Sequence, residues 1–191
     1  GQWNHYTFTF DDATKTQSIF VNGVLNASNT ATLSIGYDAN VFNLGAANNT
    51  GPTADFLDGG IDELSVYNRV LTAIEIQAIA NAGTAGKCKP TATVAPSGQV
   101  GWWSGDGNAN DIAGTNNGTL QNGAIHTIGK VGQGFSFNGA DAVLATPNST
   151  LNNAFPTISI EGWVNPTTHG TDETGTFGKT IVSNTNGDGF A

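Results

Sequence analysis

The stretch that decides the fold runs from Gly59 to Gly83 and reads GGIDELSVYNRVLTAIEIQAIANAG. Its first part, IDELSVY, alternates apolar and polar residues with a rough period of two, which predicts a half-buried strand. A capping box follows, because the Thr72 hydroxyl and the Glu75 carboxylate can satisfy opposite free amides of a first helical turn. Gly83 is placed to end that helix in a left-handed conformation. The stretch therefore predicts a strand that leads into one short helix near 72–82.

The residues before this stretch predict more strands. The alternation of residues 1–10 puts Tyr6, Phe8 and Phe10 on one face of a strand. A second strand near 17–21 ends at Asn22-Gly23, which is a strong signal for a type I′ hairpin turn. Two short segments follow at 33–36 and 41–45, and the second leads into a polar loop.

Composition favours the same fold class and excludes several functions. The chain has 26 glycines, 11% charged residues and 38% apolar residues, which describes short strands joined by tight turns around a real core. Its net charge of −9 opposes binding to nucleic acid or to anionic membranes. No apolar run is long enough for membrane insertion, and no leader is recognised, so we expect a mature or excised segment.

The single cysteine, Cys88, excludes an internal disulfide and a cysteine-rich zinc site. It is either a free thiol or half of a bridge whose partner lies outside the segment. It belongs to 84–99, whose prolines and small residues predict an extended linker. A domain boundary is expected here.

Several motifs resemble the laminin G-like, concanavalin A-like jelly-roll domains. The run from Phe56 to Thr72 resembles their closing strand and helix, and Trp3, His5 and Asp11 match a hairpin of the same family. Beyond the linker, three runs resemble the opening half of the domain: 100–111, 129–139 and 158–166. The resemblance implies an all-β, antiparallel jelly-roll β-sandwich with one short helix.

The order of these halves is reversed. Residues 1–83 resemble the C-terminal half of such a sandwich, and residues 100–191 resemble the N-terminal half. Three explanations remain open: two neighbouring repeats of a tandem array cut out of phase, one permuted domain, or a subunit completed by another copy.

The densest set of oxygen ligands lies in the sequence GDGNAND. Asp106, Asn108 and Asn110 alternate on a glycine-rich loop, and this spacing suits a hard cation such as calcium. The family resemblance implies that Asp111 and Asp62 contribute to such a structural calcium site. The alternative is a turn whose side chains bond their own backbone.

Enzymatic motifs are absent from the sequence. Retaining glycoside hydrolysis needs two carboxylates on one face, whereas Asp62 and Glu63 are adjacent and are expected on opposite faces of a strand. Glu161 stands alone among apolar neighbours. His5 has no acidic or thiol partner at ligand spacing, so we expect a structural role for it.

Sugar binding would need exposed aromatic rings. Trp102 and Trp103 are adjacent, so one of them is expected to face outward and could stack on a sugar. Glycosylation sequons occur at four positions: Asn26, Asn48, Asn117 and Asn148.

These observations predict a non-enzymatic structural or adhesion module, extracellular or at the cell surface, within a tandem array or filament. Its expected partners are neighbouring copies or repeats, and glycans or surface proteins. A carbohydrate-binding module is the alternative, and a glycoside hydrolase of the same fold is the third interpretation.

Overall fold

The computed structural model describes residues 1–36, 42–46, 56–87, 94–140, 142–144, 151, 155–167 and 181–183. Cys88 lies outside these residues. The elements are, in order, β1 (Asn4–Asp11), β2 (Thr16–Val21), β3 (Val24–Thr30), β4 (Asn43–Leu44), β5 (Asp58–Tyr67), α1 (Ala73–Ala82), the 3-10 turn η1 (Gly83–Ala85), β6 (Gln99–Trp103), β7 (Thr119–Gln121), β8 (Ile125–Ile128), β9 (Gln133–Asn138), β10 (Ala142–Leu144), β11 (Thr157–Pro166) and β12 (Val182–Ser183).

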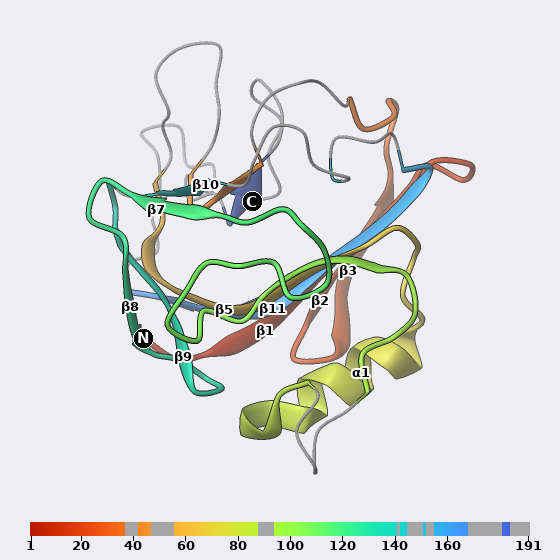
Figure 1. Ribbon diagram of the computed structural model, residues 1–191. Coiled ribbons are helices and arrows are strands. Elements are labelled where there is room, and N and C mark those ends of the chain that lie inside the picture. Colours follow the sequence, from red (N-terminus) through yellow and green to blue (C-terminus); the bar gives the residue numbers. More distant parts are fainter. Residues whose placement is uncertain are drawn as a thin grey trace.

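Two antiparallel sheets form the described fold. The larger has the order β3-β2-β1-β11-β5-β9-β8, with β6 also beside β5, and the smaller has the order β12-β4-β10-β7. The small sheet lies on one side of the large sheet and α1 lies on the other (Figure 1). The expected all-β sandwich with one short helix is confirmed. No helix in the described part of the chain is long and apolar enough to span a membrane.

Strands from the two ends of the chain alternate at the centre of the large sheet. β11 lies between β1 and β5, and β5 also pairs with β9 and β6. Thus every strand that pairs with β5 comes from beyond residue 98. The segments 1–83 and 100–191 therefore share one sheet in this chain.

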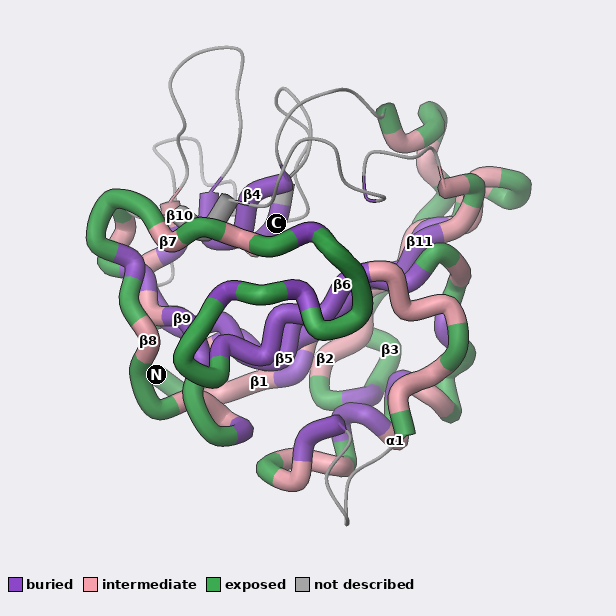
Figure 2. The backbone as a smooth tube through the Cα atoms, viewed as in Figure 1, coloured by how far each residue is buried: buried purple, intermediate pink, exposed green. Residues whose placement is uncertain are grey.

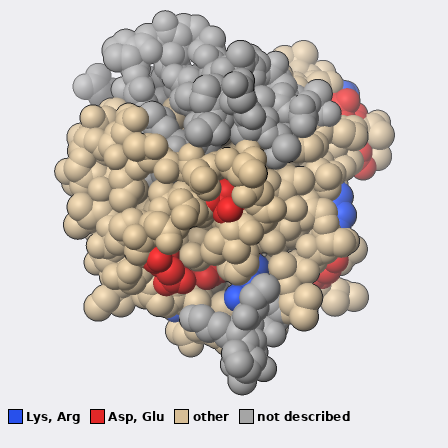
Figure 3. All heavy atoms as spheres, viewed as in Figure 1, with Lys and Arg blue, Asp and Glu red and all other residues tan. Residues whose placement is uncertain are grey.

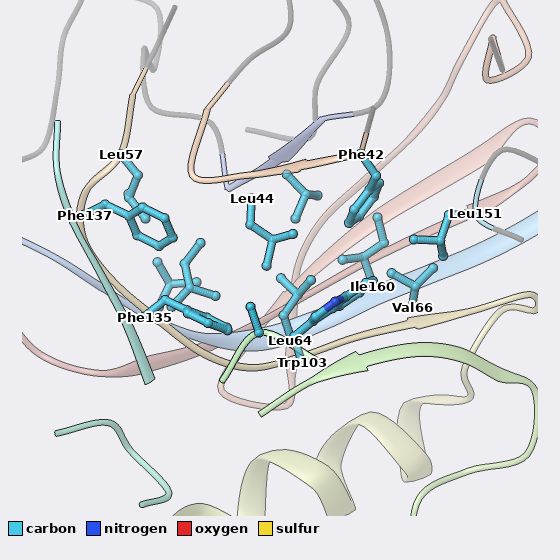
Figure 4. Close-up of a cluster of buried hydrophobic side chains, with 14 of the residues drawn as sticks. Phe42, Leu44, Leu57, Leu64, Val66, Trp103, Phe135, Phe137, Leu151 and Ile160 are labelled. Carbon is cyan, nitrogen blue, oxygen red and sulfur yellow. The ribbon is translucent and has the colours of Figure 1, made fainter. Parts of the chain in front are cut away.

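The core fills the space between the sheets. Leu44 of β4 faces Leu64 of β5 and Ile160 of β11, and Phe135 and Phe137 of β9 close one end (Figure 4). The aromatic face predicted for the first strand is confirmed, because Tyr6, Phe8 and Phe10 all pack against this core. Burial of these side chains is the main stabilising contribution.

The opposite face of the large sheet is buried as well. Every residue of β5 after Asp58 is buried, while β3 at the edge of the sheet is exposed along its whole length (Figure 2). The apolar face of α1 accounts for part of this cover: Ile76 and Ile79 pack against Tyr67 and Leu71. Strands covered on both faces cannot show a simple alternation of apolar and polar residues.

The predicted helix has the predicted cap. Thr72 Oγ1 accepts from the Glu75 amide at 3.3 Å, and the Glu75 carboxylate accepts from the Thr72 amide at 2.9 Å. Arg69 holds the same carboxylate at 2.7 and 3.0 Å. Gly83 does end the helix with a positive φ of 54°, but its ψ of −126° lies outside the left-handed helical region, and η1 follows.

The segments before β5 differ in their strand pairing. The hairpin at Asn22-Gly23 is confirmed, with φ values of 51° and 81° that fit the predicted turn. Of the two short segments, 33–36 has no strand pairing and Leu33 is 77% exposed, whereas 41–45 contains β4.

A bulge in β5 overturns the expected orientation of its two acidic residues. Ile61 and Leu64 both face the core although they are three positions apart, and the register with β11 shifts between them. Glu63 is the inserted residue, with a φ of 56°. Asp62 and Glu63 therefore lie on the same, outer face of the sheet, because an extra residue breaks the alternation of a regular strand.

Candidate functional site

The outer face of the large sheet carries six side chains that form a buried ionic cluster. They are His5 of β1, Glu63 and Tyr67 of β5, Lys87 after η1, Trp102 of β6 and Glu161 of β11. None is more than 9% exposed. Ionisable side chains are rarely buried to this degree unless they are paired.

Lys87 is the cation of the cluster. Its ammonium donates to Glu161 Oε1 at 2.8 Å and to the backbone oxygen of Glu63 at 2.9 Å, and Glu63 Oε2 lies 3.5 Å away. The same ammonium lies 5.6 Å from the centre of the Trp102 ring. The ammonium thus donates two hydrogen bonds and has a second carboxylate within ion-pair distance.

Glu161 is held from both sides. His5 Nε2 lies 2.7 Å from Oε2, and the Tyr67 hydroxyl donates to Oε1 at 3.5 Å. Burial on its own would raise the pKa of Glu161, but Lys87 and His5 outweigh it and hold that pKa well below the usual range. His5 Nδ1 is buried without a hydrogen-bond partner among the described residues, so the proton belongs on Nε2 and is donated to Glu161.

The cost of burying the Glu63 carboxylate is offset less by nearby cations and donors than the cost of burying Glu161. Burial raises its pKa above the ordinary value, and this exceeds the opposing effects of Lys87 and of the Trp102 indole, which donates to Oε2 at 2.9 Å. The difference between the two carboxyls follows from distance, because Lys87 lies closer to Glu161. The same cluster thus lowers the pKa of Glu161 and leaves that of Glu63 raised.

Asp62 lies beside the cluster on the same face. Oδ2 accepts from the Val131 amide at 2.7 Å, but Oδ1 is buried without a partner among the described residues. Burial, with the nearby charge of Glu63 as a smaller cause, raises the pKa of Asp62 to about 7. The Asp62 carboxyl is therefore costly to ionise in the folded chain.

A cover made of two segments closes over these groups. A Cβ at Gly86 would lie 2.6 Å from the Val131 side chain, so the segment that carries Lys87 and the loop at 129–132 pack in direct contact. Lys130 of that loop places its ammonium 4.7 Å from the Trp163 ring centre. The cover belongs partly to the predicted linker 84–99, whose first residues are folded against the sheet.

A cavity on the other side of the sheet differs in character. It has a volume of about 90 Å³ and lies between the sheets, with Phe8, Ile19 and Ile181 among its lining residues. Its lining is almost entirely apolar, so it holds few polar groups that could orient a ligand.

Several of the residues predicted to bind calcium accept hydrogen bonds from backbone and side-chain amides. Both oxygens of Asp111 are used: Oδ1 accepts from the amides of Trp102, Ala113 and Gly114, and Oδ2 from Asn116. Asn108 Oδ1 accepts from the Asn110 amide at 2.9 Å, and Asp106 Oδ1 from the Gln133 amide at 2.9 Å. Amide donors thus occupy oxygens that a calcium ion would need.

Only Asp62 Oδ1 of that set is buried and unpartnered in the described residues. The described residues hold no group of three or more His, Cys, Asp or Glu side chains that could bind a metal. The loop at 104–117 fits the alternative of a turn stabilised by its own side chains. The calcium site therefore stays a prediction from the sequence.

The two tryptophans considered for sugar stacking are buried. Trp103 is 0% exposed, stacks on Phe42 and donates its indole hydrogen to the Asn116 carbonyl at 3.1 Å. Trp102 is 9% exposed and belongs to the ionic cluster. The expectation that one of them faces outward is wrong, because both faces of the sheet are covered at β6.

Two of the four sequons fall on described residues. Asn26 and Asn117 are both exposed, and Asn117 accepts the Asp111 amide through its side-chain oxygen at 3.1 Å. Asn48 and Asn148 lie outside the described residues.

The cluster itself was missed by reasoning from sequence. His5 lies 156 positions from Glu161, and Lys87 lies 74 positions from it, so no local spacing connects them. One signal was present: Glu161 is a charged residue within the apolar strand ISIEGWV, and such a residue requires a buried partner.

The two antiparallel sheets and the core between them define an all-β sandwich. Residues 1–77 match the family model Laminin_G_3, described as the concanavalin A-like lectin/glucanases superfamily. These residues are therefore similar to that family, and the match covers less than half of the 191 residues. Comparisons with curated proteins and with solved structures gave no match.

Proposed function

We propose that the chain is a non-enzymatic structural module of an extracellular or cell-surface protein, which joins neighbouring copies of itself through the free edge of its larger sheet. The observation that carries this proposal is strand β3. It is an edge strand of seven residues, and all seven are exposed.

The sequence of β3, VLNASNT, contains no charged residue and no proline. Edge strands of soluble domains commonly carry lysine or proline, which prevent another strand from pairing. Val24 and Leu25 add apolar side chains that are 65% and 54% exposed. A bulge opposite Ile19 and Phe20 is a protective feature of this edge. Addition of a strand from a second copy would satisfy the free backbone groups.

The charge of the chain sets the conditions for association. The net charge of −9 makes copies repel one another, and acidic side chains are scattered over the face in Figure 3. Salt screens such repulsion over roughly 8 Å at physiological ionic strength. Pairing through an uncharged edge should therefore strengthen as salt rises.

The geometry supports a glycoside hydrolase less well than a structural module. Glu63 and Glu161 are brought together by Lys87, but they are 3% and 1% exposed and share one cation. Retaining hydrolysis needs two carboxyls that flank an accessible sugar bond. A carbohydrate-binding function also has less support, because neither Trp102 nor Trp103 is exposed for stacking on a sugar.

Sedimentation equilibrium over a range of protein and salt concentrations tests the proposal. The unglycosylated chain should associate reversibly, more strongly at high salt, and Leu25→Lys should weaken this at least tenfold. Ile112→Lys is the matched control, because Ile112 is also 54% exposed and the variant adds the same charge. The unglycosylated chain is used because a sugar on Asn26 would cover the edge.

Two results would contradict the proposal. One is a monomer at every concentration and salt level. The other is association that Leu25→Lys and Ile112→Lys weaken equally, since this would place the contact elsewhere or assign the loss to charge alone. Electron microscopy of the native assembly would then show whether copies join edge to edge.

A further inference from the structure

The buried ionic cluster holds more than a simple ion pair needs. Lys87 lies between two carboxylates, and the nearer one has a second donor, His5, on its other oxygen. The groups that meet here are a nucleophile, a proton acceptor and a hydrogen-bond donor for a carbonyl oxygen. Together they are the parts required for acyl transfer to an amine.

We propose that Lys87 and Glu161 condense into an intramolecular amide bond, which links the segment after η1 covalently to β11. The carboxylate of Glu63 serves as the proton relay, and His5 is a positioning residue that holds Glu161.

Each group has a defined part in this reaction. The Lys87 Nζ lies 2.8 Å from Glu161 Oε1, within reach of the Cδ carbon that it attacks. Glu161 Oε2, held by His5 at 2.7 Å, becomes the carbonyl oxygen of the amide, and the His5 hydrogen bond stabilises the negative charge that develops there. Oε1, on the side of Lys87 and Tyr67, is the oxygen that departs.

The reaction balances without any co-reactant. The Nζ–Cδ bond forms and the Cδ–Oε1 bond breaks. Of the three ammonium hydrogens of Lys87, one stays on the amide nitrogen and two leave with Oε1 as water. Glu63 Oε2, 3.5 Å from Nζ, carries these protons from nitrogen to the departing oxygen. Its raised pKa suits a group that must take up a proton and release it.

Burial favours the amide over the ion pair. Two opposite charges kept out of water retain a large desolvation cost, and condensation removes both charges. A fixed contact also gives the reacting groups a high effective concentration. The other lysine ion pair in the described residues, Lys15 with Asp12, has side chains about one third exposed, at 33% and 35%, and remains in contact with water.

The test is the intact mass of the purified, folded full chain. We expect a mass lower than that of the sequence by one water molecule. After digestion with a protease that cleaves at lysine, cleavage at Lys87 should be lost, and the peptide with Lys87 should be joined to the peptide with Glu161. Cleavage at Lys15 should be normal, which serves as the control within the same molecule.

Variants separate the roles. Glu161→Ala should keep its full mass. Glu161→Gln should reach the same final mass as the cross-linked chain, because it loses ammonia and yields the same amide. Glu63→Ala should fold, as judged by its circular dichroism, yet keep its full mass.

Three outcomes would overturn the proposal. A folded chain that keeps its full mass excludes the bond. A water loss that maps to peptides without Lys87 and Glu161 places the modification elsewhere. A complete water loss in Glu63→Ala removes the relay that the reaction requires.

Discussion

The imidazole of His5 and the carboxylate of Glu161 lie 156 positions apart in the sequence and 2.7 Å apart in the structure. The contact joins the first strand of the chain to a strand from the far segment, inside the outer layer of the sandwich. In the register of β1 and β11, His5 faces Trp163 and Thr7 faces Glu161, and the His5 and Trp163 rings meet edge to face at 5.1 Å. An anchoring role for His5 follows from this geometry.

Removal of the central cation should destabilise the fold strongly. Relative to the chain before Lys87 and Glu161 condense, Lys87→Met would leave Glu63 and Glu161 buried without their cation, and breaking a buried pair in this way costs about 3–5 kcal/mol. Lys15→Met removes an exposed pair and should cost less than about 1 kcal/mol. Urea unfolding of both variants measures the difference. Equal costs would show that the cluster is open to water.

Asp62 should make the chain less stable as pH rises. Below pH 3.8 its carboxyl is protonated in both the folded and unfolded states and has no effect. Between pH 3.8 and about 7 only the unfolded state releases the proton, so stability falls, by about 4 kcal/mol at most from about three pKa units. Asp62→Asn should flatten this fall in urea unfolding between pH 4 and 8. Asp58→Asn, on the same strand, should leave the fall in place.

The opposite trend should appear in acid. The Arg69 guanidinium beside Glu75 lowers the pKa of that carboxyl to about 2, so its contribution is present above pH 4.5 and is lost as pH falls toward 2. Unfolding midpoints should therefore be highest near pH 4 to 5. A maximum above pH 7 would contradict the assignment for Asp62.

The cover of the cluster should fail when Gly86 is replaced. Gly86 has a φ of 65°, and a Cβ there would lie 2.6 Å from Val131, so Gly86→Ala should cost about 1–3 kcal/mol. Gly36→Ala is the control, because no atom lies within 4 Å of its Cβ position. Hydrogen exchange of the Val131 amide, which is bonded to Asp62, should also speed up in the Gly86 variant alone.

The helix cap should contribute a measurable amount to stability. Thr72→Ala removes the side chain that accepts the Glu75 amide and should cost about 1 kcal/mol in urea unfolding. Thr115→Ala, at an exposed loop position, should be neutral. A neutral Thr72→Ala would mean that packing alone holds α1.

Calcium removal should have little effect. Amide donors occupy Asp111 and Asn108, so a chelator should leave the midpoint of thermal unfolding unchanged. A fall of several degrees on chelation would restore the calcium site predicted from the sequence.

The sequence predicted those features that depend on neighbouring residues. The hairpin at Asn22-Gly23 and the cap formed by Thr72 and Glu75 are local, since the residues that determine each lie within a few positions. The family motif around β5 predicted the β-sandwich fold.

Features set by distant contacts could not be read in this way. The bulge at Glu63 depends on its register with β11, which lies about a hundred positions away, so the assumption of alternation placed Asp62 and Glu63 on opposite faces. Trp102 was a candidate for an exposed ring because Lys87, which lies over that ring, belongs to a segment whose sequence resembles a linker. Partners of buried charges are likewise distant, and a single sequence gives no pairing information.

The alternation of strands in the large sheet has a consequence for how the chain folds as it is synthesised. β5 is complete at residue 67, but its partners β6, β9 and β11 begin at residues 99, 133 and 157. Before residue 99 leaves the ribosome, the only strand pairs of the large sheet that can form are those of β1, β2 and β3, and β5 has no neighbouring strand. Contacts so far apart in sequence make folding slow and leave strand edges exposed meanwhile. A nascent chain stalled before residue 157 should be sensitive to protease, and release of ten or more further residues should protect it.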